Sequence, residues 1–184
     1  MDVLKYLRDT QDLAITYGGR VSPAERNKLL VYADANFSKR PSIRKSRSGF
    51  VIFLNGGPVA WKSSLQTHTA LSTTESELYA MFGAVKQSLW LKTFMSEVGF
   101  DQGPLSCFED NSGLLAWIEN PRMSSRMQHI ELQYYWLRDT KTDGLCNFFH
   151  VETLLQRADL LTKQMDVGPI RPQLRMLFNS YLLA

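Results

Sequence analysis

The sequence predicts an α/β protein in which five strands form one mixed sheet, three antiparallel strands followed by two parallel strands, with helices on both faces. Three observations lead to this prediction. Three apolar segments near the start are separated by short turns, later apolar segments alternate with helical patterns, and one long helical pattern ends at a glycine. Short turns join antiparallel strands, whereas helical crossovers join parallel strands.

The antiparallel strands come first. A helix over residues 2–10 and a strand or extended segment over 13–17 are expected before them. Residues 29–37 predict the first sheet strand, in which Asp34 shares a face with Tyr32 and Asn36. The remaining two strands are expected over residues 49–54 and 59–63, joined by the hairpin signal Asn55-Gly56-Gly57-Pro58.

Helices and parallel strands account for the rest of the chain. Ser72 precedes two threonines and an acid, which predicts a helix N-terminus, and this helix is expected to end at Gly99. Asn111 is expected to cap a shorter helix. The remaining elements are predicted as strands over residues 105–110 and 145–151 and helices over 126–140, 155–164 and 170–182.

Composition excludes several classes of protein. The 184 residues are 44% hydrophobic and 21% charged, which is typical of globular domains and excludes collagen and low-complexity chains. No apolar run reaches the roughly 18 residues needed to cross a bilayer, so no membrane partner is expected. Two cysteines, Cys107 and Cys146, predict no disulfides and a reducing compartment. The net charge of +3 neither indicates nor excludes a nucleic-acid partner.

Four acids are expected to converge at one edge of the sheet: Asp34 in the first strand, Glu77 on the long helix, Asp110 at the end of the fourth strand, and Asp159 on a later helix. A carboxylate inside an apolar strand, such as Asp34, needs a hydrogen-bonding, ionic or metal partner. Oxygen ligands in this number suit Mg²⁺ or Mn²⁺, and two such ions suit phosphoryl transfer. Taken singly, Glu77 and Asp159 are also compatible with solvated helix residues, and Asp110 with a helix cap.

Ordered motifs resemble those of one known family, the ribonuclease H domain of copia-type (Pseudoviridae) LTR retrotransposon polyproteins. In sequence order they are Tyr32-Ala33-Asp34-Ala35-Asn36-Phe37, Arg44-Lys45-Ser46-Arg47-Ser48-Gly49-Phe50, Gly57-Pro58-Val59-Ala60-Trp61-Lys62, Ala70-Leu71-Ser72-Thr73-Thr74-Glu75-Ser76-Glu77-Leu78-Tyr79-Ala80, Glu109-Asp110-Asn111-Ser112, His129-Ile130-Glu131 and Ala158-Asp159-Leu160-Leu161-Thr162-Lys163. The resemblance covers nearly the whole chain.

The resemblance implies a ribonuclease H-like fold that hydrolyses the RNA strand of RNA–DNA hybrids by two-metal-ion attack of water. Asp34, Glu77, Asp110 and Asp159 match the family's metal-binding acids. By this analogy Asp34 bridges two Mg²⁺ ions, with Mn²⁺ as an alternative. Asp159 completes the coordination of one ion, and Glu77 and Asp110 complete the coordination of the other. Glu75 competes with Glu77, but residues two apart on a helix point about 200° apart, and the motif favours Glu77.

Substrate contacts are expected from basic and polar side chains near the acids. Asn111 is equally compatible with a cap, and His129 with helix packing. His150 precedes Asp159 where many ribonucleases H carry a loop histidine, but its apolar surroundings favour the end of a strand. The expected contacts are Asn36, Arg44, Lys45, Arg47, Ser72, Thr74, Asn111, Arg126 and His129.

The expected organisation is a connection segment from the reverse transcriptase side over residues 1–28, a ribonuclease H domain over 29–165, and a C-terminal helix over 166–184. The expected partners are an RNA–DNA hybrid and the polymerase and connection domains of the same polyprotein, in the cytoplasm and within virus-like particles. Two alternatives stay open: a remnant that binds without cleaving, and another nuclease of this fold, such as a DNA-resolving or integrase-like enzyme. The four intact acids argue against the first, and the copia-like motifs argue against the second.

Overall fold

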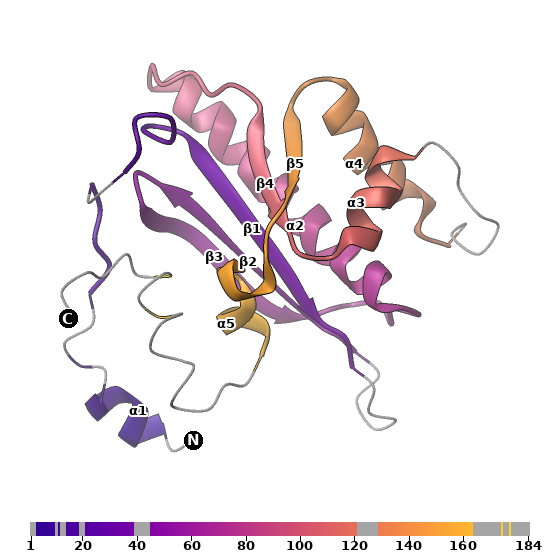
Figure 1. The fold of residues 1–184 in the computed structure, drawn as a ribbon, viewed down its shortest axis with the longest axis horizontal. Coiled ribbons are helices and arrows are strands. Elements are labelled where there is room, and N and C mark those ends of the chain that lie inside the picture. Colours follow the sequence, from indigo (N-terminus) through magenta and orange to yellow (C-terminus); the bar gives the residue numbers. More distant parts are fainter. Residues whose placement is uncertain are drawn as a thin grey trace.

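One five-stranded sheet organises the chain, in the order β3-β2-β1-β4-β5 (Figure 1). The computed structural model describes residues 3–9, 11, 14–18, 21–38, 45–120, 129–163, 174 and 177. Strands β1 to β3 are antiparallel neighbours, whereas β4 runs parallel to β1, and β5 parallel to β4. The predicted mixed sheet is therefore confirmed. Its strands are β1 (Leu29–Asn36), β2 (Arg47–Leu54), β3 (Gly57–Leu65), β4 (Leu105–Glu109) and β5 (Cys146–His150).

Helices cover both faces of this sheet. Three of them, α2, α3 and α4, pack on one face, and α5 lies on the other (Figure 1). In the described part of the chain, no helix has the length and apolar character to cross a membrane. The helices are α1 (Val3–Asp9), α2 (Thr73–Glu97), α3 (Ser112–Glu119), α4 (Glu131–Thr142) and α5 (Asp159–Thr162), with a 3₁₀ turn, η2 (Thr153–Leu155).

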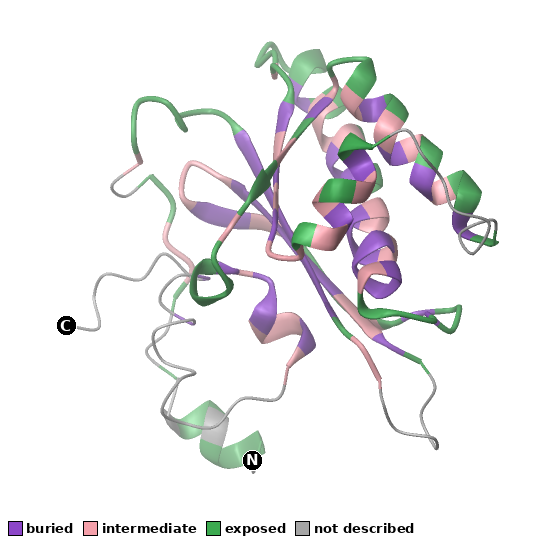
Figure 2. Cartoon of the chain, turned by 45° about the vertical axis from the view of Figure 1, so that its right-hand side comes forward, coloured by how far each residue is buried: buried purple, intermediate pink, exposed green. Residues whose placement is uncertain are grey.

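The core has two parts because side chains alternate along β1. Val31 and Ala33 point toward α2, while Leu30 and Tyr32 pack on the opposite side with Ala158. Figure 2 shows the resulting band of buried residues through the centre of the sheet. By the same alternation Asp34 belongs to the α5 face, as its shared face with Tyr32 predicts.

Local sequence signals set the ends of several elements. The Ser72 hydroxyl accepts a hydrogen bond from the Glu75 N–H at 3.1 Å and caps α2. The Asn111 side chain accepts from the Leu114 N–H at 3.1 Å and caps α3, as predicted. In the hairpin, Asn55 has a φ of 50° and Gly56 a φ of 80°, the left-handed pair typical of a two-residue turn between antiparallel strands.

The helix expected over residues 155–164 is wrong in its bounds. The chain instead forms η2 and then α5, which begins at Asp159. Gln156 accounts for the break, because its buried side chain donates to the Ala33 carbonyl oxygen at 2.9 Å and accepts from the Ala158 N–H at 3.3 Å. These bonds attach the segment to the sheet through a residue with extended backbone.

Three other predicted elements differ from the structure or fall partly outside its described residues. The segment expected over 13–17 forms no strand in its described residues 14–17, although the Tyr17 hydroxyl donates to the Pro58 carbonyl oxygen at 2.9 Å. The helix expected from residue 126 is α4, which begins at Glu131, and residues 126–128 lie outside the described part. Most of the expected C-terminal helix also lies outside it, but Leu174 and Leu177 are helical and buried. Cys107 and Cys146 are free thiols in the core.

Candidate active site

Five carboxylates converge at one end of the sheet, in two clusters that share Asp110. One cluster consists of Asp34, Asp110 and Asp159, and the other of Glu77, Glu109 and Asp110. Within each cluster the ligand oxygens lie within 4.8 Å of one another. The structure therefore brings all four predicted acids together and adds a fifth.

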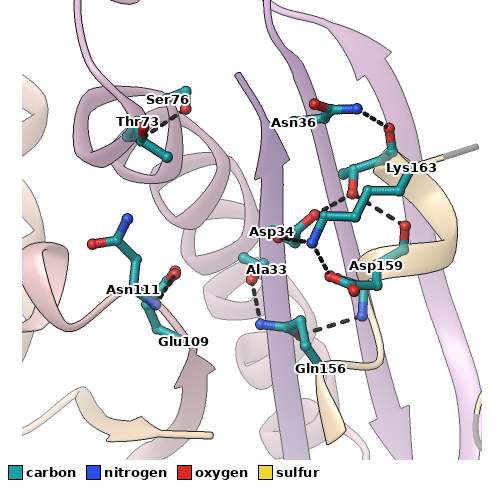
Figure 3. A network of polar contacts seen from close by, with 12 residues as sticks. Ala33, Asp34, Asn36, Thr73, Ser76, Glu109, Asn111, Gln156, Asp159 and Lys163 are labelled. Carbon is teal, nitrogen blue, oxygen red and sulfur yellow. Dashed lines mark hydrogen bonds and ion pairs between the residues drawn. The ribbon is translucent and has the colours of Figure 1, made fainter. Parts of the chain in front are cut away.

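Two members of the first cluster, Asp34 on β1 and Asp159 on α5, lie beside the side chain of Lys163 (Figure 3). The Lys163 ammonium lies 2.6 Å from Asp159 Oδ1 and 3.4 Å from Asp34 Oδ1. The Thr162 hydroxyl donates a hydrogen bond to Asp34 Oδ2. Both carboxylates are buried, so this half of the site compensates their charge with groups of α5 and the residue after it.

A glycine allows α5 to approach the strand that carries Asp34. Gly49 on β2 is the register partner of Asp34. A Cβ atom at this position would lie 2.7 Å from Thr162 Cγ2 and 2.8 Å from Leu161 Cβ. Any larger residue would therefore push α5 away, and with it Thr162, Lys163 and Asp159.

The second cluster lies on the opposite, α2 side of the sheet. Glu77 is 4% exposed and Glu109, the last residue of β4, is 0% exposed. Glu109 Oε1 accepts a hydrogen bond from the Asn111 N–H at 3.0 Å. Within the described residues, no donor reaches the buried Oε2 atoms of Glu77 and Glu109. This half of the site therefore has two buried carboxyl oxygens without a hydrogen-bonding partner among the described residues.

Burial changes the proton affinity of these groups. Burial, together with the charges of Glu109 and Asp34, raises the pKa of Glu77 to about 11. Burial also raises the pKa of Glu109 well above its ordinary value, although the Asn111 N–H opposes the shift. The pKa of Asp159 is raised by burial as well, against the hydrogen bond from Lys163. The site therefore binds positive charge strongly, as protons or as cations.

The donor set fits a divalent cation. Carboxylate oxygens are the ligands that Mg²⁺ and Mn²⁺ prefer, and the unpartnered Oε2 atoms of Glu77 and Glu109 are free to ligate. Around octahedral Mg²⁺, neighbouring oxygens lie about 3 Å apart and opposite ones about 4.2 Å apart, so ligand oxygens within 4.8 Å of one another can reach a common ion by closing together. Asp110 is common to both clusters, whereas the resemblance implies Asp34 as the bridging ligand. That role of Asp34 stays a prediction.

Glu109 is the site residue that sequence reasoning missed. It was expected only as part of the short strand before Asp110. The signal was the alternation along β4, where Leu105, Cys107 and Glu109 are buried and the residues between them are less so. An acid at a core-facing strand position indicates a special partner in the same way as Asp34.

Glu75, the competitor of Glu77, lies outside both clusters. Its Oε2 accepts from the Leu71 N–H at 2.9 Å, and its Oε1 lies 3.1 Å from His129 Nε2. Glu75 thus stabilises the start of α2 and holds the side chain of His129 against this helix. The ring of His129 contacts this glutamate, not the carboxylate clusters.

The other expected substrate contacts fall into three groups. Asn36 and Arg47 are register partners near Asp34, and exposed Lys45 lies two residues before Arg47. The Asn36 amide donates to the Thr162 carbonyl oxygen at 3.2 Å, so it also positions α5. Ser72 and Asn111 are caps, as described above, and the Thr74 hydroxyl lies so close to Gly113 that a Cβ atom there would be 3.0 Å away. Arg44 and Arg126 lie outside the described residues, and His150 is the exposed last residue of β5.

Comparison with known proteins gives relatives among transposon polyproteins. The retrovirus-related Pol polyprotein from transposon TNT 1-94 of Nicotiana tabacum is 33% identical over 161 residues, which is 88% of this chain and 12% of the relative. The corresponding polyprotein from transposon RE2 of Arabidopsis thaliana is 30% identical over 165 residues, 89% of this chain and 11% of the relative. The chain thus spans a small part of the relatives' length. No family model matches it.

Solved structures share the fold. LC11-RNase H1, solved in complex with an RNA/DNA hybrid, has a TM-score of 0.57 at 16% identity, over 73% of this chain and 94% of that one. The N-terminal RNase H domain of Rv2228c from Mycobacterium tuberculosis has a TM-score of 0.52 at 12% identity, over 73% and 90%. These likenesses confirm the expected fold. The chain is therefore homologous to a part of the retrovirus-related Pol polyproteins from copia-type plant transposons, and it has the fold of ribonuclease H domains.

Proposed function

We propose that this chain is a metal-dependent endonuclease that hydrolyses the RNA strand of RNA–DNA hybrids. The observation that carries the proposal is the convergence of Asp34, Glu77, Asp110 and Asp159 within a ribonuclease H fold. The RNA/DNA hybrid bound by LC11-RNase H1 supports this class of substrate. The 2′-hydroxyl would distinguish the RNA strand from DNA.

The proposed chemistry assigns a task to each half of the site. Two Mg²⁺ ions, or Mn²⁺, would lower the pKa of the attacking water and neutralise charge on the scissile phosphate. Asp34 and Asp159 would hold the cation on the α5 side, and Glu77 the cation on the α2 side, with Asp110 between them. Asn36, Lys45 and Arg47 lie at the same end of the sheet, so they are candidates for contact with phosphates.

The relatives extend the proposal to the context in which the chain works. Because they are Pol polyproteins, we infer that the polymerase and connection domains of a reverse transcriptase are partners in the same polyprotein. Residues 1–28 would be the connection segment, residues 29–165 the ribonuclease H domain, and residues 166–184 a C-terminal helix. The proposed location is the cytoplasm, within virus-like particles.

The test is a cleavage assay on the purified chain with labelled RNA–DNA hybrid, RNA–RNA and DNA–DNA duplexes. Each duplex is incubated with Mg²⁺, Mn²⁺ or EDTA, and the variant Asp110→Asn serves as the control. We expect cleavage of the RNA strand of the hybrid only, abolished by EDTA and by the substitution. A wild-type chain that cleaves no more hybrid than Asp110→Asn would be a binding remnant, and cleavage of plain DNA would indicate another nuclease of this fold.

A further inference from the structure

Glu109 is an acid that the four-residue metal set does not include. It ends β4, and its side chain is 0% exposed beneath α2 and α3. The two preceding core-facing residues of the strand, Leu105 and Cys107, fill the apolar core. A carboxylate at a core-facing position of this strand carries a large desolvation penalty unless a charged or hydrogen-bonding partner compensates it.

Only part of that compensation comes from the described protein. Glu109 Oε1 accepts the Asn111 N–H, but no described donor reaches Glu109 Oε2. Glu77 Oε2 is buried and without a described donor in the same way. The Lys163 ammonium group forms its ion pairs with Asp34 and Asp159, in the other cluster. Glu77 and Glu109, members of the same cluster, therefore each keep one buried oxygen without a bonded partner among the described residues.

The carboxylates of this cluster have the arrangement of cation ligands. One oxygen from each of Glu77, Glu109 and Asp110 falls within a group no wider than 4.8 Å. Asp110 is only partly buried, so the group has a path to solvent on that side. Three carboxylates, one from α2 and two from consecutive residues at the end of β4, favour a hard divalent cation over a proton shared by a single pair.

We propose that Glu109 is a direct ligand of the divalent cation that Glu77 and Asp110 also bind. The α2 half of the site then has three carboxylate ligands, one more than the family set provides there. The inference rests on the proposed nuclease function, because it specifies how the same site holds its metal. It also makes this half the tighter one, since no lysine among the described residues forms an ion pair with Glu77 or Glu109, whereas Lys163 is paired with Asp34 and Asp159.

A purely structural role for Glu109 makes a different prediction. In that case its carboxyl group serves only to accept the Asn111 N–H and hold the start of α3. The substitution Glu109→Gln separates the two roles, because glutamine keeps the accepting oxygen and the volume but removes the charge. Glu75→Gln is the matched control, since Glu75 is a buried glutamate, 2% exposed, outside both clusters.

The experiment measures Mn²⁺ binding to the full chain by titration calorimetry and by electron paramagnetic resonance. We expect Glu109→Gln to weaken the tighter Mn²⁺ site by about tenfold or more, because even residues that only support metal ligands contribute that much. Glu75→Gln should bind as the wild type does. In EDTA the unfolding temperature of Glu109→Gln should equal or exceed that of the wild type, since a buried charge is removed.

Each result has one meaning. Unchanged Mn²⁺ affinity and stoichiometry in Glu109→Gln, or no Mn²⁺ binding by the wild type, overturns the proposal. A lower unfolding temperature in EDTA with unchanged Mn²⁺ affinity assigns Glu109 the structural role instead. Hybrid cleavage is not part of this readout, so weakened Mn²⁺ binding in an inactive chain would support the cation site while the nuclease function fails. Hybrid cleavage by the wild type, together with unchanged Mn²⁺ binding in Glu109→Gln, would support the nuclease function and overturn the role of Glu109 as a ligand.

Discussion

The two halves of the carboxylate site differ in how their charge is compensated. On the α5 side, Lys163 and Thr162 bond to Asp34, and Lys163 also bonds to Asp159. On the α2 side, the buried Glu77 and Glu109 each keep one oxygen without a donor among the described residues. The first half is stabilised by the protein itself, whereas the second depends on a proton or a cation.

This difference follows from the elements that supply each half. Lys163 comes one helical turn after Asp159, so a single short helix brings an acid and its counter-ion to β1 together. Glu77 and Glu109 come from α2 and β4, whose surrounding residues fill the apolar core. A core-facing position offers few polar neighbours, so a carboxylate there carries a desolvation penalty that a bound proton or cation offsets.

The largest effect is expected from Asp110, the residue that both halves share. Asp110→Asn should reduce hybrid cleavage on the order of 10³-fold, because it weakens the several kcal/mol of charge stabilisation that bound metal supplies. Initial rates of cleavage of a labelled hybrid in Mg²⁺ measure this. Asp139→Asn, on the exposed side of α4, is the control and should retain activity. Equal activity of Asp110→Asn and wild type would break the idea of a shared ligand.

The second effect concerns pH. The raised pKa values of Glu77 and Glu109 mean that the folded chain binds more protons than the unfolded chain. Their stabilising effect is complete below the ordinary glutamate pKa, and it is lost as pH rises toward the folded values. In EDTA the unfolding temperature should therefore fall by about 5–10 °C between roughly pH 5 and 8, if the penalty reaches a few kcal/mol.

The pH dependence of the unfolding temperature also tests whether the α2 half is its source. Glu77→Gln should flatten the fall in unfolding temperature, because the glutamine has no charge to bury. Added Mg²⁺ should also flatten it, since a cation replaces the protons. The measurement is thermal unfolding in EDTA, monitored by circular dichroism across this pH range. A wild-type unfolding temperature that does not change with pH would contradict the proposed difference between the two halves.

A smaller effect is expected from the cation of the α5 half. Lys163→Met should lower the free energy of unfolding in EDTA by about 2 kcal/mol, because it leaves Asp34 and Asp159 without their counter-ion, although partial exposure of the lysine weakens the pair. Lys141→Met is a matched control: its side chain is 31% exposed against 35% for Lys163, but its partner Glu119 is 61% exposed.

Urea unfolding with and without Mg²⁺ measures this prediction. Mg²⁺ should restore most of the stability of Lys163→Met, because the cation can occupy the position of the ammonium group. Equal destabilisation by the two lysine substitutions, or a loss that Mg²⁺ does not reduce, would show that Lys163 acts only as a surface charge.

The smallest effect is expected from the Thr162 hydroxyl. Thr162→Val keeps the shape of the side chain but removes the bond to Asp34, so the free energy of unfolding should fall by about 1 kcal/mol. Mn²⁺ binding on the α2 side should be unchanged. Urea unfolding measures the first effect and calorimetry the second, with the exposed Thr142→Val as control. Loss of the tighter Mn²⁺ site in Thr162→Val would mean that the two halves are not separable.

Much of the site could be predicted because its signals are local. Alternation along β1 placed Asp34 on the face of Tyr32. Helix periodicity allowed only one of Glu75 and Glu77 to face the site, and the family motif then favoured Glu77. Asp110 follows from its position at the end of a strand. Each of these inferences needs only a few neighbouring residues, since strand and helix periods are properties of the backbone.

Other features could not be predicted because they depend on contacts between distant segments. Gln156 ends η2 and bonds to Ala33, 123 residues earlier, so the expected continuous helix is replaced by two short turns. Lys163 reaches Asp34 across 129 residues. No local pattern indicates either partner.

The sequence by itself determined the order of elements, the caps of α2 and α3, the mixed sheet and the four acids that gather at its edge. The tertiary structure alone decided that Asp110 is shared, that Glu109 joins Glu77, and that a lysine compensates only one half. The physical reason is that periodicity sets the face on which a side chain lies. Strand register and helix packing then set which charges from different faces come within bonding distance.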